Sequence, residues 1–169
     1  MTKREPMLPP WVNTQPKRLL LDAKPLTAFV VGATNPSLLG RKSTQGFGAS
    51  DFELIWNLVQ TTPLLVTPHL LAEVNSWLNG MGSAREELRA HFGVMIREMR
   101  EHYSESSALA GEESFPQIGL TDSSILAAAQ AQEALVITTD SELYGNLLHH
   151  NVPALLYQNL VDYRREIQN

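Results

Sequence analysis

Cysteine is absent from all 169 residues of the sequence. Its absence excludes a disulfide framework, a thiolate zinc site and a cysteine nucleophile. The sequence also has no apolar run near the roughly 20 residues that a helix needs to cross a bilayer. Its first residues include basic ones but no apolar segment after them, so they do not have the pattern of a secretory signal. We therefore expect a cytoplasmic protein with no membrane partner.

Positive charge is not in excess either, because the formal net charge is −5. This argues against a protein that coats nucleic acid by electrostatic attraction alone. It does not exclude an enzyme that acts on nucleic acid, since carboxylates that hold cations count as negative in this sum. The hydrophobic fraction of 43% and the charged fraction of 18% are typical of a globular protein.

The chain divides into an N-terminal stretch and one domain. Residues 1–17 contain several prolines and no periodic apolar pattern, which predicts an extended arm. Residues 18–169 have a length and composition that suit a single domain with a substantial core.

Short apolar runs predict four strands. These runs cover residues 18–22, 63–67, 135–139 and 152–157. Apolar residues at helical spacing predict helices at residues 25–32, from Ser50 onward, and at 68–79, 83–103, 121–133 and 141–150. Strands that alternate with helices in this way indicate an α/β fold with a mainly parallel sheet covered on both faces.

Several helix starts have recognisable caps. Ser50 and Ser83 each begin a capping-box pattern, and Thr67 followed by proline suits the start of a third helix. The stretches 33–49 and 104–119 contain glycine and many polar residues, so we expect loops there. The polar segment at the C-terminus is compatible with a further helix.

Four carboxylates occupy places where the expected elements meet. Asp22 and Asp140 each end an apolar strand. Glu73 lies on the helix after the second strand, and Asp122 lies in the first turn of the alanine-rich helix. Because ligands bind beyond the carboxyl ends of parallel strands, we expect these side chains to converge on one edge of the sheet. Converging carboxylates repel one another unless a cation joins them, so the pattern predicts a divalent metal site and metal-assisted phosphodiester hydrolysis.

Each acid also has an ordinary structural role open to it. Asp122 and Asp140 could cap helices, and Asp22 could be a turn residue. Glu73 borders an apolar stripe and has no lysine or arginine three or four positions away, so a local ion pair does not explain it. The four acids taken together are more informative than any one of them.

These segments resemble the PIN domain, a family of metal-dependent ribonucleases that includes the toxins of many bacterial toxin–antitoxin pairs. The resemblance covers roughly residues 18–158. Its most specific part is Asp122, which opens an alanine-rich helix, followed about 18 residues later by a strand that ends in Thr138-Thr139-Asp140. Glu73 looks like the helix-borne acid of the family, and Asp22 looks like its first-strand aspartate.

The resemblance implies a three-layer α/β/α sandwich and an endoribonuclease that depends on Mg²⁺ or Mn²⁺. The catalytic residues and metal ligands that it implies are Asp22, Glu73, Asp122 and Asp140. Thr138 would support the site through its hydroxyl, and Glu142 lies where some members carry a further acid. Ala23 departs from the family, which often has a small hydroxyl or amide residue at that place.

The resemblance also implies partners. These are an RNA substrate, an antitoxin protein if the chain is the toxin of a toxin–antitoxin module, and a second copy of the chain in a homodimer. Lys24 is a candidate for contact with a substrate phosphate, and its alternative is a solvated loop charge. The alternative function is a catalytically inactive PIN-like module that binds RNA or protein.

Overall fold

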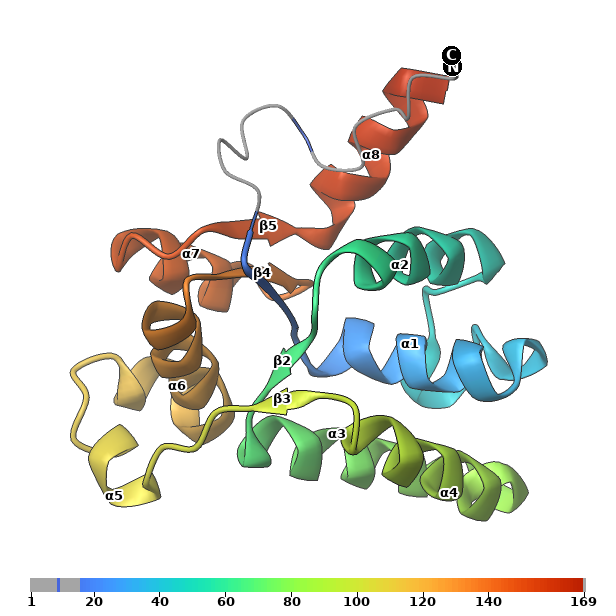
Figure 1. The fold of residues 1–169 in the computed structure, drawn as a ribbon, viewed down its shortest axis with the longest axis horizontal. Helices are drawn as coiled ribbons and strands as arrows, with labels where there is room; N and C mark the ends of the chain where they lie inside the picture. Colours follow the sequence, from blue (N-terminus) through green and yellow to red (C-terminus); the bar gives the residue numbers. More distant parts are fainter. Residues whose placement is uncertain (1–8, 10–15, 169) are drawn as a thin grey trace.

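Parallel strands run through the computed structural model, which describes residue 9 and residues 16–168 (Figure 1). The strands are β1 (Arg18–Leu21), β2 (Leu65–Val66), β3 (Arg100–Glu101), β4 (Ala134–Thr138) and β5 (Ala154–Leu156). β4 pairs in parallel with both β1 and β5, and β2 pairs in parallel with β3. A parallel bridge between Leu19 and Leu64 joins the two groups, so the strands follow the order β3-β2-β1-β4-β5.

Helices cover both faces of these strands, as the alternating sequence pattern predicts. The helices are α1 (Ala23–Thr34), α2 (Ala49–Thr61), α3 (Pro68–Asn79), α4 (Arg85–Ile96), α5 (Ser106–Leu109), α6 (Phe115–Gln132), α7 (Ser141–His149) and α8 (Tyr157–Gln168). Figure 1 shows α1, α2 and α4 on one side of the strands and α6 and α7 on the other. The expected α/β class with helices on both faces of a parallel sheet is therefore confirmed. Within the described residues, no helix is long and apolar enough to cross a membrane.

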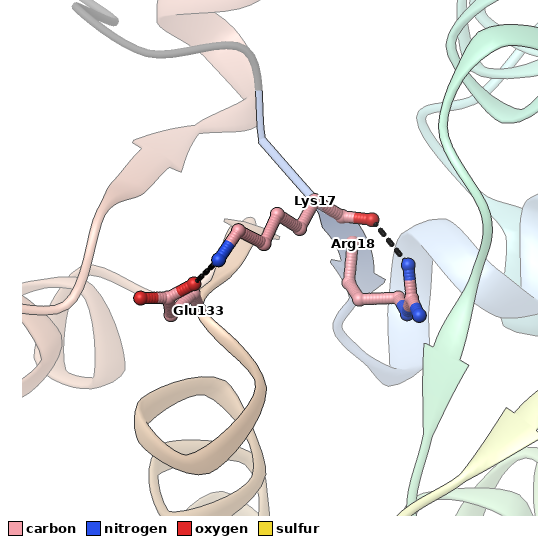
Figure 2. Close-up of polar contacts among 3 residues, drawn as sticks. All are labelled: Lys17, Arg18 and Glu133. Carbon is pink, nitrogen blue, oxygen red and sulfur yellow. Dashed lines mark hydrogen bonds and ion pairs between the residues drawn. The ribbon is translucent and has the colours of Figure 1, made fainter.

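The start of the β1–β4 pair is joined by a surface contact. Lys17 forms an ion pair with Glu133, which has a left-handed backbone (φ 51°) and caps the end of α6. Arg18 donates a hydrogen bond to the backbone carbonyl of Lys17 at 2.8 Å (Figure 2). Both members of the ion pair are exposed, so it contributes roughly 0.2–1 kcal/mol. It lies beside the first residues of both strands, at the opposite end from Asp22.

Two helix starts differ from the prediction. α2 begins after Gly48, not at Ser50, and Asp51 accepts the Gly48 N–H at 2.7 Å. α4 has no side-chain cap, because a short 3₁₀ turn (Gly82–Ala84) precedes it in place of the capping box expected at Ser83. At α2 the Asp51 side chain makes the capping contact, and at α4 the preceding 3₁₀ turn leads directly into the helix.

The prediction of one helix over residues 83–103 is wrong. α4 ends at Ile96, and the chain then forms β3. The N–H groups of Arg100 and His102 donate to the carbonyls of Leu64 and Val66 at 3.1 and 2.9 Å. Pairing with β2 therefore prevails over the helical spacing of the apolar residues that precede it.

The remaining expectations also need small corrections. Residues 104–119 form α5 and the first turn of α6 instead of a loop, and Gly119 (φ 73°) interrupts α6 before Thr121. The expected loop over 33–49 contains two short 3₁₀ helices, Pro36–Leu38 and Lys42–Thr44. The expected arm over residues 1–17 lies outside the described residues except at positions 9, 16 and 17.

Candidate functional site

Asp22 is fixed at the carboxyl end of β1, where it caps α1. Only 8% of the residue is exposed. Its Oδ1 accepts the N–H of Ala23 at 2.6 Å, and its Oδ2 accepts the hydroxyl of Thr138 at 2.7 Å. Ala23 has no polar side chain, but its backbone N–H donates a hydrogen bond to Asp22. Asp22 acts as a helix cap, and it also lies at the rim predicted for the site.

The pKa of the Asp22 carboxyl is raised, because the effect of burial outweighs the effect of its hydrogen bonds. Burial raises the pKa most strongly, and the hydrogen bonds from Thr138 and Ala23 lower it. The negative charges of Glu73 and Asp140 then raise it further. Glu73 and Asp140 therefore lie within electrostatic reach of Asp22.

Asp140 lies beside Asp22 across the β1–β4 pair and is joined to it through Thr138. The Thr138 hydroxyl oxygen accepts the N–H of Asp140 at 2.9 Å. Asp140 Oδ1 in turn accepts the N–H groups of Glu142 and Leu143 at 2.7 and 3.0 Å, so it caps α7. Asp140 is therefore a helix cap that also lies at the acidic rim, and one carboxylate oxygen serves the cap.

Asp122 lies within electrostatic reach of the other acids at the rim. Burial and then the charges of nearby acids raise its pKa to about 7; the acids are, from the largest effect, Asp22, Asp140, Glu73 and Glu142. The segment of α6 that carries Asp122 begins after the interruption at Gly119, and no hydrogen bond to the Asp122 side chain occurs within the described residues. Helix capping therefore does not explain Asp122.

Glu73 comes from α3, whose first turn is tied to the helix that carries Asp122. Thr67 caps α3 by accepting the Leu70 N–H at 3.2 Å, and its hydroxyl lies 2.7 Å from Ser124 Oγ. Ser124 donates to the carbonyl of Thr121 at 2.6 Å, which leaves Thr67 as the donor to Ser124. The sequence does not predict this buried hydrogen bond between α3 and α6. The Thr67-Pro68 cap gave a signal for Thr67, whereas nothing in the sequence singled out Ser124.

The acids at this rim have no basic partner in the part of the chain that the structure describes. The ion pairs there are Lys17 with Glu133 and Arg165 with Asp162, and neither involves the rim. Lys24 lies in the first turn of α1, two residues after Asp22, and is half-buried without an ion pair. The rim thus gathers negative charge that no described cation neutralises.

The chemistry of the donor set fits a hard divalent cation, although the side chains do not form a closed cage. Among the described residues, no three Asp, Glu or His side chains are placed so that they could hold a metal ion together. Mg²⁺ usually binds through one or two protein carboxylates together with waters and substrate phosphates, so a closed cage is not required. The residues that could hold the ion are Asp22, Glu73, Asp122 and Asp140, with Glu142 close to Asp122.

The structure brings all of the acids predicted from the sequence to the same end of the sheet, with Thr138 between two of them. Lys24 lies beside them, at the first turn of α1. No family model matches this chain, and no curated protein matches it.

Proposed function

We propose that this chain is an endoribonuclease that depends on Mg²⁺ or Mn²⁺. The observation that carries the proposal is the position of Asp122 on α6 at the rim where Asp22 and Asp140 follow β1 and β4; burial and the charges of four other acids raise its pKa to about 7. A half-buried carboxylate surrounded by like charges is unfavourable for a protein unless a cation or a proton occupies the site. Sites with perturbed carboxylates at the carboxyl ends of parallel strands are also where α/β proteins bind ligands.

The residues of the site would have different roles in holding the metal ion. Asp22 is held in one orientation by the donors at Ala23 and Thr138, so it offers a fixed oxygen position. Asp122 and Glu73 approach from the helices and would complete the ligand set. A bound divalent ion would lower the pKa of a water and neutralise charge that develops on the phosphodiester.

RNA as the substrate is inferred from the resemblance to the PIN domain. The same resemblance supports a role as the toxin of a toxin–antitoxin module, with an antitoxin protein and a second copy of the chain as partners. Lys24 is the nearest basic residue in sequence to the rim, and we assign it to contact with a substrate phosphate.

A second candidate function is a non-catalytic module that binds RNA or protein. The observation that favours it is the lack, within the described residues, of three acidic or histidine side chains placed to hold one metal ion. In that case Asp22 and Asp140 would have a structural role, as the N-caps of α1 and α7.

The test is incubation of purified full-length protein with mixed structured and unstructured RNA, in Mg²⁺, in Mn²⁺ and in EDTA. Asp122→Asn is compared with Asp162→Asn, a matched change at an exposed aspartate on α8. Cleavage that needs metal, persists in Asp162→Asn and disappears in Asp122→Asn supports the proposal. Absence of cleavage with either metal, together with absence of metal binding by calorimetry, would overturn it in favour of the binding module.

A further inference from the structure

Tyr103 presents its ring to solvent next to the acidic rim. The residue is 69% exposed, more than any other large hydrophobic residue in the described part of the chain. An exposed aromatic side chain is ordinary by itself. Its position and the rigidity of the backbone around it are what single out Tyr103.

The position of Tyr103 follows from the sheet. β3 ends at Glu101, and the His102 N–H makes the last hydrogen bond to β2, at Val66, over 2.9 Å. Because β3 is parallel to β2, and β2 is joined in parallel to β1, the chain leaves β3 at the same edge of the sheet as Asp22. Neighbouring strands lie about 4.8 Å apart, so Tyr103 emerges roughly 10 Å along this edge from the end of β1.

The backbone on both sides of Tyr103 is held in place. His102 is anchored to β2, and the Ser106 hydroxyl lies 2.9 Å from His69 Nε2 in the first turn of α3. Within the described residues, the Tyr103 ring stacks on no other aromatic side chain and its hydroxyl makes no hydrogen bond. Because the backbone is anchored on both sides of the ring, less conformational entropy is lost when a ligand covers the ring.

We infer that Tyr103 is a stacking platform for one unpaired base of the RNA substrate, beside the phosphodiester held at the acidic rim. The inference rests on the proposed function and adds a preference for single-stranded RNA. Aromatic side chains stack on bases of any sequence, but only on bases that are not enclosed in a duplex. The separation along the edge is one that neighbouring nucleotides of an extended strand can bridge.

The sequence neighbours of Tyr103 do not supply the apolar patch that an anchoring aromatic residue of a protein interface needs. Arg100, Glu101 and Glu105 are all exposed, and Ser104 separates the last of these from the tyrosine. Protein interfaces place their anchoring aromatic residues at the centre of a water-excluding patch. Charged residues next to it in the sequence do not form such a patch, whereas a single base needs only the face of one ring.

The test measures RNA binding separately from cleavage. Full-length Asp122→Asn protein is the reference, because RNA then stays intact in Mg²⁺. A short fluorescein-labelled single-stranded RNA reports the Kd by anisotropy, and a copy with 2-aminopurine reports stacking by quenching. Adding Tyr103→Ala is expected to raise the Kd about 5- to 150-fold and to remove the quenching, since a stacked base contributes roughly 1–3 kcal/mol.

Two further variants control the result. Tyr103→Phe keeps the ring and is expected to restore the reference Kd. Leu148→Ala removes a side chain of a 47%-exposed residue near the end of α7, about 12 Å along that helix from Asp140, and is expected to leave the Kd unchanged. A duplex of the same sequence is expected to show no difference between the reference and Tyr103→Ala.

The outcomes separate this inference from the proposed function. If Tyr103→Ala binds single-stranded RNA as tightly as the reference, stacking is overturned, while metal-dependent cleavage by the wild-type chain leaves the nuclease proposal intact. Equal losses in Tyr103→Ala and Tyr103→Phe would assign the effect to the hydroxyl and also overturn stacking. Loss of self-association in Tyr103→Ala with unchanged RNA binding would place Tyr103 in a protein interface instead. If the wild-type chain neither binds nor cleaves RNA with either metal, the proposed function and this inference fail together.

Discussion

The hydroxyl of Thr138 lies 2.7 Å from Asp22 Oδ2, across the pairing of β1 with β4. The same oxygen accepts the N–H of Asp140 at 2.9 Å. One buried hydroxyl therefore fixes the relative position of two acids that follow different strands. Removal of this hydroxyl is the most direct way to loosen the site without changing its charge.

Thr138→Val keeps the shape of the side chain but removes the hydrogen bond to Asp22. We expect a loss of about 1–3 kcal/mol in the free energy of unfolding, because Asp22 and the Asp140 N–H both lose a buried partner. We also expect metal affinity or cleavage to fall roughly 10- to 100-fold, the usual effect of losing a residue that orients a metal ligand. Thr138→Ser, which keeps the hydroxyl, should retain most of the stability and most of the metal affinity or cleavage. Denaturant unfolding and cleavage rates measure the two effects, and a Val variant with unchanged cleavage would contradict the role.

Asp122→Asn should stabilise the protein in EDTA while abolishing its activity. The change removes one negative charge from a group of carboxylates that repel one another, so the melting temperature should rise. Mg²⁺ should raise the melting temperature of the wild-type chain, because a ligand of the folded state stabilises it, and should have little effect on the variant. Thermal melts with and without Mg²⁺ test this, and Asp162→Asn is the control. A variant that melts below the wild type in EDTA would contradict repulsion at the site.

The stability of the protein without metal should fall as pH rises from about 4 to about 7. The folded pKa of Asp122 is raised to about 7 from an ordinary value of 3.8, so the folded state holds a proton that the unfolded state has already lost. Since the folded state binds more protons over this interval, the free energy of unfolding decreases with rising pH. The free energy of unfolding should depend less steeply on pH in Asp122→Asn and in saturating Mg²⁺. Denaturant unfolding at a series of pH values measures it, and an unchanged slope in the variant would assign the effect to other groups.

Ser124→Ala and Ser123→Ala form a matched pair of changes at adjacent buried positions. Ser124 joins α6 to the cap of α3 through Thr67, so its loss should cost about 1–2 kcal/mol and should weaken metal binding through Glu73. Ser123 Oγ is buried without a hydrogen-bond partner in the described residues, so its removal should be neutral or stabilising. Calorimetric metal binding and unfolding curves compare the two. Equal effects of both changes would show that the Thr67–Ser124 link has no special part in placing Glu73.

Much of the fold could be predicted from the sequence because its signals are local. The runs that form β1 and β4 are continuous and apolar, as strands buried on both faces require. The Thr67-Pro68 start of α3 is a cap and a first-turn proline side by side. Asp22 and Asp140 could be predicted at the rim because each lies within two residues of the end of such a strand.

The unpredicted parts depend on contacts between distant residues. β3 has only two residues, both charged and exposed, so neither apolar alternation nor composition marks it as a strand. β3 forms because the N–H groups of Arg100 and His102 donate hydrogen bonds to the carbonyls of Leu64 and Val66. The Thr67–Ser124 contact spans 57 positions, and the exposure of Tyr103 depends on where β3 ends. Such features become visible only when the chain has folded.

The two residues of β3 also bear on how the protein behaves when it is concentrated. β3 is the outermost strand on its side, and it carries the exposed charges of Arg100 and Glu101. Strands that end a sheet can recruit the same strand of another molecule and begin a fibre, and short, charged terminal strands resist this. A segment that at first looks like an interruption between two helices therefore also protects the sheet against growth from molecule to molecule.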